Sequence, residues 1–157
     1  MKNLIFMLDV DGVMTTGQFL YSEHGKKYKV FGPHDNDGLK LIKNKVNIQF
    51  ITADRSGYQI TKRRIVDDMG FELELVSEQE RFKYIKENYN YNNMIYMGDG
   101  LYDVKILKEC MFGIAPNNAR KEAKIAASFI TESNAGDGAV LDACLEILRR
   151  YNFNYEL

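Results

Sequence analysis

The feature that most constrains the fold is an alternation of short apolar runs with longer amphipathic ones along the chain. The short runs predict strands, at residues 4–8, 47–52, 72–76, 94–97, 112–115 and 128–130. The longer runs predict helices, at residues 38–44, 58–69, 80–89, 101–109, 119–127 and 139–151. This β-α-β-α order predicts a three-layer α/β/α, Rossmann-like fold with a mostly parallel sheet.

One segment breaks the alternation directly after the first expected strand. Residues 18–31 read QFLYSEHGKKYKVF, in which two aromatic runs flank a turn around His24 and Gly25. We expect a small β-hairpin insert here. The insert is too small to be a second domain, so residues 1–157 are expected to form a single domain.

Composition argues against several classes of protein. The 21 Lys and Arg residues nearly balance the 22 Asp and Glu residues, so no surface for nucleic acid is expected. No apolar run approaches the roughly 18 residues of a membrane span, and the apolar residues before Asp9 are too few for a signal peptide. Cys110 and Cys144 form no C-x-x-C pair, which fits a reduced, cytoplasmic setting.

Polar residues stand where three of the expected strands end. Asp9 and Asp11 end the first strand, Thr52 ends the second, and Asp99 ends the fourth, with Asp103 shortly after it. The carboxyl ends of parallel strands meet at one edge of a sheet, so these four acids are expected to share a cleft. Crowded carboxylates repel one another unless a cation neutralises them, and oxygen ligands without His or Cys favour Mg²⁺.

Glycines accompany these acids. Gly12, Gly98 and Gly100 let the backbone approach a ligand closely, and N–H groups at such turns bind phosphate. A carboxylate nucleophile beside a metal and a phosphate site indicates an aspartyl-phosphate intermediate. A lone D-x-D is often only a turn or a helix cap, but polar motifs at three strand ends favour the chemical interpretation.

Several stretches resemble the haloacid dehalogenase-like phosphohydrolases. LDVDGVMTTG is similar to the family's first motif, FITADRSG to its second and YMGDGLYD to its fourth. The match is closer to the largely capless branch related to 3-deoxy-D-manno-octulosonate 8-phosphate phosphatase, which FGPHDNDGLKLI and GDGAVLDACLEIL also resemble. The resemblance covers residues 4 to about 148.

The resemblance implies a role for each matched residue. Asp9 would be the nucleophile, and Asp11 would act as general acid and then as general base. The metal ligands would be Asp9, Asp11 through its backbone carbonyl, Asp99 and Asp103. The phosphoryl group would be bound by Asp11, Gly12, Thr52, Ala53 and Lys83.

The family's third motif is a basic residue early in a helix, and VSEQERFKYIKENY offers more than one. Lys83 is the prediction, because the family uses lysine at this position. Arg81 is the alternative, since the register of this stretch against the family is uncertain. The expected catalytic set is therefore Asp9, Asp11, Thr52 and Lys83.

An open site without a cap needs other walls to read its substrate. In the branch that this chain resembles, neighbouring subunits supply them, so the apolar hairpin predicts a homo-oligomer, a tetramer by resemblance. The candidate substrate contacts are His34, Arg55 and Lys26. His34 falls where sugar-acid phosphatases of this branch often carry Arg, which makes the usual eight-carbon sugar acid a doubtful substrate.

The resulting hypothesis is a Mg²⁺-dependent phosphatase, a phosphoric monoester hydrolase. Its substrate would be a phosphorylated sugar, sugar acid or sugar conjugate in bacterial carbohydrate biosynthesis, such as that of surface polysaccharide. Two alternatives are a non-catalytic oligomerising domain of the same fold and a phospho-accepting, receiver-like signalling module. The D-x-D spacing disfavours the receiver, whose acidic pair is adjacent, and a phosphomutase would need a cap to retain its intermediate.

Overall fold

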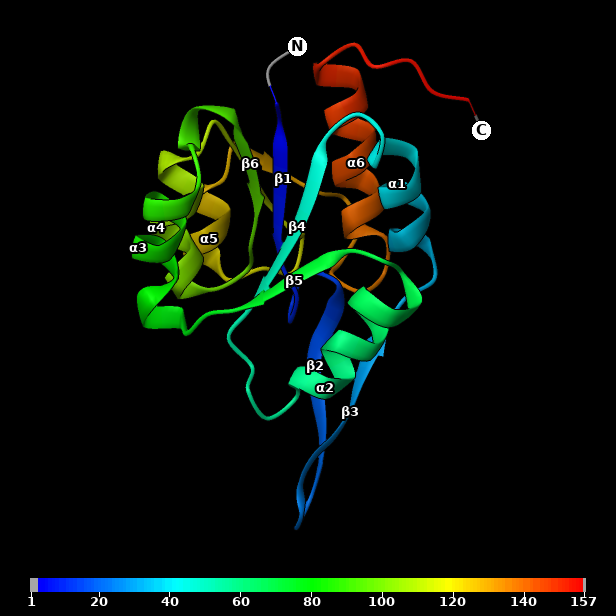
Figure 1. Ribbon diagram of the computed structural model, residues 1–157, viewed down its shortest axis with the longest axis vertical. Helices are drawn as coiled ribbons and strands as arrows, with labels where there is room; N and C mark the ends of the chain where they lie inside the picture. The colour runs from blue at the N-terminus through cyan, green and yellow to red at the C-terminus, as the bar shows by residue number, and fades with distance from the viewer. Residues whose placement is uncertain (1–2, 157) are drawn as a thin grey trace.

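A six-stranded parallel sheet lies between two layers of helices in the computed structural model, which describes residues 3–156 (Figure 1). The strand order is β5-β4-β1-β6-β7-β8. The bounds are β1 (Ile5–Asp9), β4 (Asn47–Thr52), β5 (Glu72–Leu75), β6 (Met94–Met97), β7 (Phe112–Ala115) and β8 (Phe129–Ile130). The predicted three-layer α/β fold is confirmed, and each of these strands lies within one residue of its predicted bounds.

Helices cover both faces of the sheet (Figure 1). One face carries α3 (Glu78–Asn88), α4 (Val104–Glu109) and α5 (Lys121–Ala126), and the other carries α1 (His34–Ile42), α2 (Tyr58–Lys62) and α6 (Ala139–Arg150). Shorter helical turns are π-helical η1 (Arg63–Asp68) and the 3₁₀ turns η2 (Tyr91–Asn93) and η3 (Leu101–Asp103). The helix predicted at 58–69 is therefore split between α2 and η1. Within residues 3–156, no helix is both long enough and apolar enough to cross a membrane.

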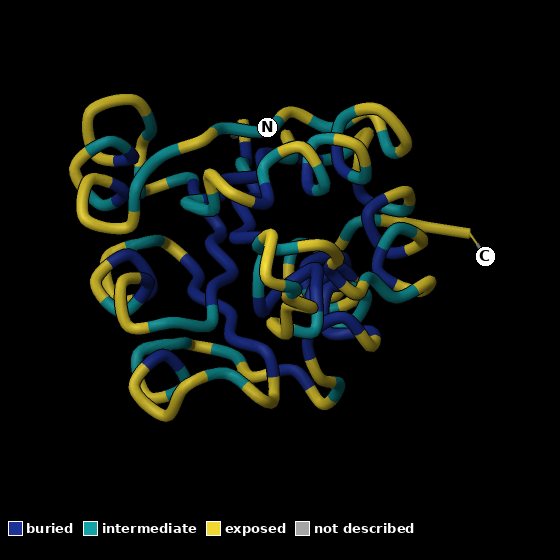
Figure 2. Tube along the Cα trace, turned by 90° about the horizontal axis from the view of Figure 1, so that it is seen from below, coloured by how far each residue is buried: buried dark blue, intermediate teal, exposed yellow. Residues whose placement is uncertain are grey.

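The central strand β1 is apolar on both of its faces because helices cover both. Phe6 and Leu8 pack into the cluster beneath α1 and α6, whereas Met7 points to the cluster beneath α3 and α4. Figure 2 shows these buried segments running through the middle of the molecule between exposed helix faces and loops. A strand buried on both sides turns polar only where it leaves the core, which is at Asp9.

A two-stranded antiparallel hairpin projects from the body beyond the end of β1 (Figure 1). It consists of β2 (Thr15–Ser22) and β3 (Gly25–Phe31) and forms a sheet of its own. The predicted insert is confirmed, although it begins at Thr15 rather than at residue 18. Because the hairpin leaves directly from the loop after β1, its base lies next to the carboxyl ends of the central strands.

Helix α6 depends on a carboxylate of α1 for its first turn. Asp35 Oδ1 accepts hydrogen bonds from the backbone N–H groups of Val140, at 2.9 Å, and Leu141, at 3.3 Å. The residue that precedes the helix is Gly138, which has no side chain to cap it. The two helices also pack closely, since a Cβ at Gly38 would lie 2.8 Å from the Cα of Leu141. Asp35 therefore has a structural role in joining α1 to α6.

We expect Asp35→Ala to lower the free energy of unfolding by about 1–2 kcal/mol, because it removes an N-terminal cap. Urea denaturation followed by circular dichroism measures this difference. Asp37→Ala is the matched control on the same helix, where the exposed carboxylate pairs only with Lys40, and it should cost less than about 0.5 kcal/mol. Equal losses in the two variants would contradict the capping role.

Candidate active site

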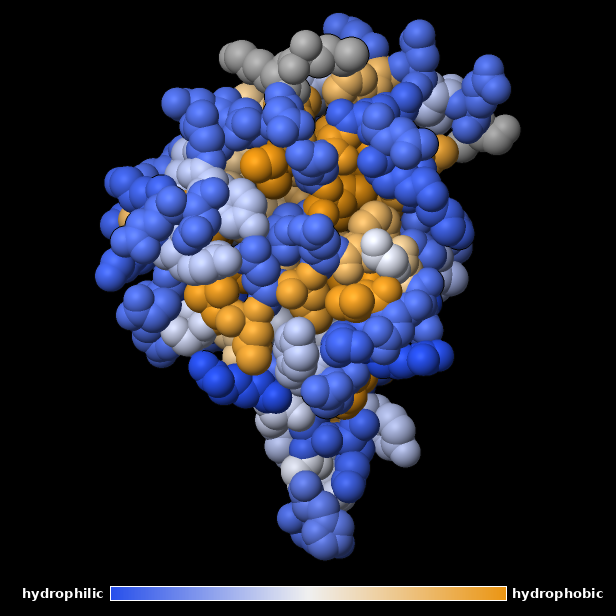
Figure 3. Space-filling model, in the orientation of Figure 1, coloured by the Kyte–Doolittle hydropathy of each residue, from blue (hydrophilic) through white to orange (hydrophobic). Residues whose placement is uncertain are grey.

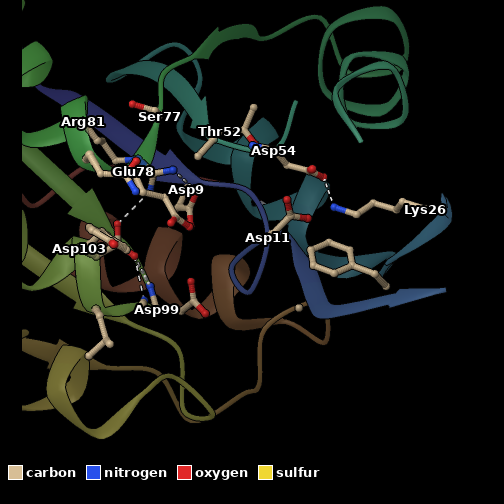
Figure 4. A pocket seen from close by; sticks show the side chains of 17 residues that line it. Asp9, Asp11, Lys26, Thr52, Asp54, Ser77, Glu78, Arg81, Asp99 and Asp103 are labelled. Atoms are coloured by element: carbon tan, nitrogen blue, oxygen red, sulfur yellow. Dashed lines mark hydrogen bonds and ion pairs between the residues drawn. The ribbon is translucent and has the colours of Figure 1, made fainter. Parts of the chain in front are cut away.

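A cleft of about 500 Å³ opens where β1, β4 and β6 end, the position at which parallel α/β sheets bind ligands (Figure 4). The cleft is lined by Asp9, Asp11, Gly17, Phe19, Lys26, Thr52, Ala53, Asp54, Ser77, Glu78, Gln79, Arg81, Asp99, Gly100, Leu101, Tyr102 and Asp103. The four acids expected to meet are all among these residues. The hairpin contributes Phe19 and Lys26, so it forms part of the wall.

Three carboxylates in the cleft are close enough to share one cation. Asp9 ends β1, Asp99 follows β6 and Asp103 ends η3, and one oxygen from each lies within 4.8 Å of the others. Gly12 makes this approach possible, because it has φ +83° and a Cβ there would overlap the Asp99 carboxylate. The donor set is all oxygen, as Mg²⁺ prefers.

The pKa values of Asp9 and Asp99 show the cost of crowding the acids without a cation. Burial raises the pKa of Asp9 well above its ordinary value, the neighbouring Asp103 and Asp99 raise it further, and Arg81 opposes them. Burial and the nearby Asp103 raise the pKa of Asp99 to about 7. A bound divalent cation would favour the ionised form of both groups, so the residues present fit a metal site.

Asp103 has a further role that the sequence did not indicate. Its Oδ2 accepts hydrogen bonds from the backbone N–H groups of Asp99, at 3.0 Å, and Gly100, at 2.9 Å. Its Oδ1 accepts from Arg81 Nη1, at 3.0 Å, and from the hydroxyl of Tyr96. The carboxylate therefore fixes the loop that carries Asp99. Tyr96 was not foreseen, although the period of two along β6 places it on the face that α3 covers.

The basic residue beside the expected nucleophile is Arg81. Its side chain is buried, with Nη2 3.2 Å from Asp9 Oδ1 and Nη1 3.0 Å from Asp103 Oδ1. Burial alone would lower the pKa of Arg81, but Asp9 and Asp103 raise it, so the guanidinium stays charged. The predicted Lys83 is exposed and does not line the cleft. The structure thus corrects the prediction in favour of the alternative.

Helix register explains this correction. Ser77 caps α3 by accepting a hydrogen bond from the backbone N–H of Glu80, so the helix begins at Glu78. Arg81 and Ile85 are four residues apart and both buried, which places them on the face toward the sheet. Lys83 is two residues from each and projects away from that face. The spacing to Ile85 was the signal in the sequence that favoured Arg81.

The expected phosphate-binding groups are only partly available. Thr52 is buried at the end of β4, where its Oγ1 accepts a hydrogen bond from the Asp54 N–H at 3.2 Å and its own O–H can still donate. Ala53 lines the cleft beside it. The N–H of Gly12, however, donates to Thr15 Oγ1 at 3.2 Å, so this predicted phosphate donor is engaged within its own turn.

Asp11 lines the cleft but stands apart from the acidic trio. Its Oδ2 lies 2.8 Å from the Nζ of Lys29, a hairpin residue, and its Oδ1 accepts a 3.3 Å hydrogen bond from the hydroxyl of Thr15. Figure 4 places Asp11 between Asp9 and the pair formed by Lys26 and Asp54. The second aspartate of the D-x-D pair is therefore oriented by the hairpin.

Of the three candidate substrate contacts, only Lys26 lines the cleft. Its Nζ lies 2.6 Å from Asp54 Oδ2 and 3.5 Å from the centroid of the Phe19 ring, so its charge is already paired. Although burial raises the pKa of Asp54, hydrogen bonds from Lys26 and Lys29 hold it well below its usual range. His34 and Arg55 are exposed and lie outside the cleft lining.

Comparison with known proteins agrees with this geometry. A family model described as haloacid dehalogenase-like hydrolase matches residues 79–143. The 3-deoxy-D-manno-octulosonate 8-phosphate phosphatase KdsC of Haemophilus influenzae is 28% identical over 145 residues, which span 88% of this chain and 79% of that protein.

Two solved structures extend the likeness over almost the whole chain. A Pseudomonas syringae protein assigned to the YrbI family of phosphatases is 30% identical with a TM-score of 0.82, covering 94% of this chain and 86% of that one. The 3-deoxy-D-manno-octulosonate 8-phosphate phosphatase of Moraxella catarrhalis, solved with a magnesium ion, a phosphate ion and KDO, is 26% identical with a TM-score of 0.79. It covers 94% of this chain and 87% of that one.

The fold, the acidic trio at the ends of β1 and β6 and these likenesses agree with one another. The all-oxygen site suits Mg²⁺, the ion present in the Moraxella catarrhalis structure. The chain therefore belongs to the haloacid dehalogenase-like phosphohydrolases, is similar within them to the 3-deoxy-D-manno-octulosonate 8-phosphate phosphatases, and is a Mg²⁺-dependent phosphoric monoester hydrolase.

Proposed function

We propose that this chain hydrolyses the phosphomonoester of a sugar, sugar acid or sugar conjugate in the bacterial cytoplasm, during carbohydrate biosynthesis such as that of surface polysaccharide. The observation that carries the proposal is the trio Asp9, Asp99 and Asp103 beside Arg81 in the cleft. The names of the Haemophilus influenzae and Moraxella catarrhalis relatives support a sugar-acid phosphate as one member of the substrate class. We further propose that the chain acts as one domain.

In the proposed first step, a carboxylate oxygen of Asp9 forms a bond to phosphorus while the ester P–O bond breaks. Asp11 gives its proton to the leaving oxygen, so the products are a free alcohol, the Asp11 carboxylate and phosphorylated Asp9. This assignment is supported by the positions of the two acids, one beside the buried Arg81 and the other held by the hairpin. Little covalent chemistry is asked of the protein beyond placing these groups.

In the proposed second step, a water molecule attacks the phosphorus of phosphorylated Asp9 and the bond between Asp9 and phosphorus breaks. The Asp11 carboxylate takes a proton from that water, which restores both acids and releases inorganic phosphate. The O–H of Thr52 and the guanidinium of Arg81 would donate hydrogen bonds to the phosphoryl oxygens in both steps. Mg²⁺, held by Asp9, Asp99 and the Asp11 carbonyl with Asp103 directly or through water, would neutralise charge on the transferring group.

The proposal predicts phosphate release from a panel of phosphorylated sugars, sugar acids and their conjugates in the presence of Mg²⁺. Addition of EDTA should abolish the release, because the crowded carboxylates then lack their counter-ion. Asp9→Asn should reduce turnover of every substrate, p-nitrophenyl phosphate included, to the buffer blank, because the nucleophile is lost. A malachite-green assay for phosphate measures all of these.

The same panel separates the alternatives. No release from any member by the folded wild-type protein would sink the enzymatic proposal. Stoichiometric phosphorylation by acetyl phosphate without release would favour a receiver-like module. If Asp9→Asn kept every cellular effect of the wild type, the chain would be a non-catalytic oligomerising domain.

Arg81→Ala should lower kcat/KM for p-nitrophenyl phosphate by about 10²-fold or more, the usual loss when a donor to the transferring group is removed. Lys83→Ala is the control on the same helix, and its value should stay within about twofold of wild type, as for most surface changes. Because Arg81 is buried against two acids, a thermal melt must show that the variant is folded under assay conditions. A larger loss in Lys83→Ala would restore the lysine as the third-motif residue.

The hairpin is our proposed oligomer contact, in a homotetramer that closes the open cleft. Five of its large apolar or aromatic residues are exposed: Phe19, Leu20, Tyr21, Tyr28 and Val30. Figure 3 shows the hairpin standing out from the body at the lower end of the molecule. An exposed group of this kind is typical of a protein contact.

Tyr21→Ser combined with Tyr28→Ser is expected to lower the mass found by sedimentation velocity to that of a monomer, because the contact loses two exposed aromatic rings. Tyr155→Ser, at another exposed tyrosine outside the hairpin, is the control and should leave the mass unchanged. A wild-type protein that sediments as a monomer at micromolar concentration would contradict the proposed assembly.

A further inference from the structure

Lys29 is the most deeply enclosed charged side chain of the hairpin, with none of its side-chain surface exposed. It lies on β3 between two exposed residues, Tyr28 and Val30, so its side chain points toward the body while its neighbours point outward. Burying an ammonium costs free energy unless its charge is paired with an acid and its N–H groups have acceptors. The groups that contact the Lys29 ammonium therefore indicate the role of this side chain.

Three oxygens lie around the Lys29 Nζ at nearly equal distances. They are Asp11 Oδ2 at 2.8 Å, Thr61 Oγ1 at 2.7 Å and Asp54 Oδ2 at 2.8 Å. The ammonium donates hydrogen bonds to Asp11 and Thr61 and forms an ion pair with Asp54, so it is held from three sides. Thr61 belongs to α2 and Asp54 to the loop after β4, so both anchors come from the body rather than the hairpin.

The ammonium makes the two oxygens of Asp11 unequal. Oδ2 is held by a charged donor at 2.8 Å, whereas Oδ1 has only the longer 3.3 Å hydrogen bond from Thr15. A charged donor that pins one oxygen of a carboxylate fixes the direction of the other oxygen. Resting on the proposed function above, we propose that Lys29 is a positioning residue that holds Asp11 so that Oδ1 exchanges protons with the leaving alcohol and with the attacking water.

The chemistry of the first step makes this role measurable. When the ester bond breaks, an alkoxide leaving group must receive the Asp11 proton, and free alcohol and ionised Asp11 result. A p-nitrophenolate leaving group is stable as an anion and departs without that proton. Misplacing Asp11 therefore slows transfer to Asp9 from an alkyl phosphate and spares transfer from an aryl phosphate. Distortion of the whole cleft slows both.

The test compares Lys29→Met with wild type in rapid-mixing experiments at saturating Mg²⁺. The single-turnover rate of alcohol release from glycerol 2-phosphate should fall by about 10²-fold or more, the usual contribution of a general acid. The burst rate of p-nitrophenol release from p-nitrophenyl phosphate should stay within about threefold of wild type. The steady-state rate after the burst should fall, because Asp11 is also the base that activates water in the second step. Lys27→Met, an exposed lysine of the same strand, is the control and should change neither rate.

The outcomes are distinct. Equal losses with both esters, or no loss with either, overturn the positioning role of Lys29 while the phosphatase itself stands. A folded wild-type protein that releases phosphate from neither ester and from no member of the sugar-phosphate panel overturns the proposed function and this inference with it. If Lys29→Met does not fold, Thr61→Val removes one anchor of the ammonium at almost constant side-chain volume, and it must show the same selective loss with glycerol 2-phosphate.

Discussion

Repulsion among buried carboxylates is the constraint on which the rest of this structure depends. One oxygen each of Asp9 at the end of β1, Asp99 after β6 and Asp103 at the end of η3 lies within 4.8 Å of the others, a cost that the surrounding groups must offset. Arg81 offsets part of it from α3, and Tyr96 and the loop amides donate hydrogen bonds to the Asp103 carboxylate. The residual imbalance, seen in the raised pKa of Asp99, is what gives the cleft its affinity for a divalent cation.

The cleft has two charged halves of different origin. On the side of α3, the fixed cation Arg81 pairs with Asp9, the proposed nucleophile. On the side of the hairpin, Lys26 and Lys29 neutralise Asp54 and Asp11, so a separate charge-balanced group holds the proposed proton carrier. The two-residue spacing joins the halves, because Asp9 ends β1 whereas Asp11 lies in the turn after it, next to the hairpin.

The sequence allowed the sheet, the hairpin and the place of the acids to be predicted, because strands buried on two faces are nearly all apolar and change abruptly at Asp9 and Asp99. What escaped prediction depends on helix phase and on contacts between distant segments. Lys83 was chosen over Arg81 because of its residue type. The side chain that faces the sheet is instead decided by where α3 begins, which the Ser77 cap sets. The inward direction of Lys29 was hidden because the two hairpin strands shift register against each other.

The alternation along β3 has a consequence for how this protein can diverge. Lys29 points inward while Tyr28 and Val30 point outward, so removal of one residue from the strand would exchange their faces. Lys29 would then point into solvent, and an uncharged neighbour such as Val30 would face the carboxylates of Asp11 and Asp54. The exposed face of the hairpin would change at the same time. A change of length that keeps Lys29 inward must therefore fall in the turn at Glu23 and His24, or occur as paired changes in both strands. The contacts of Lys29 thus fix the length of the hairpin at its base but not at its tip.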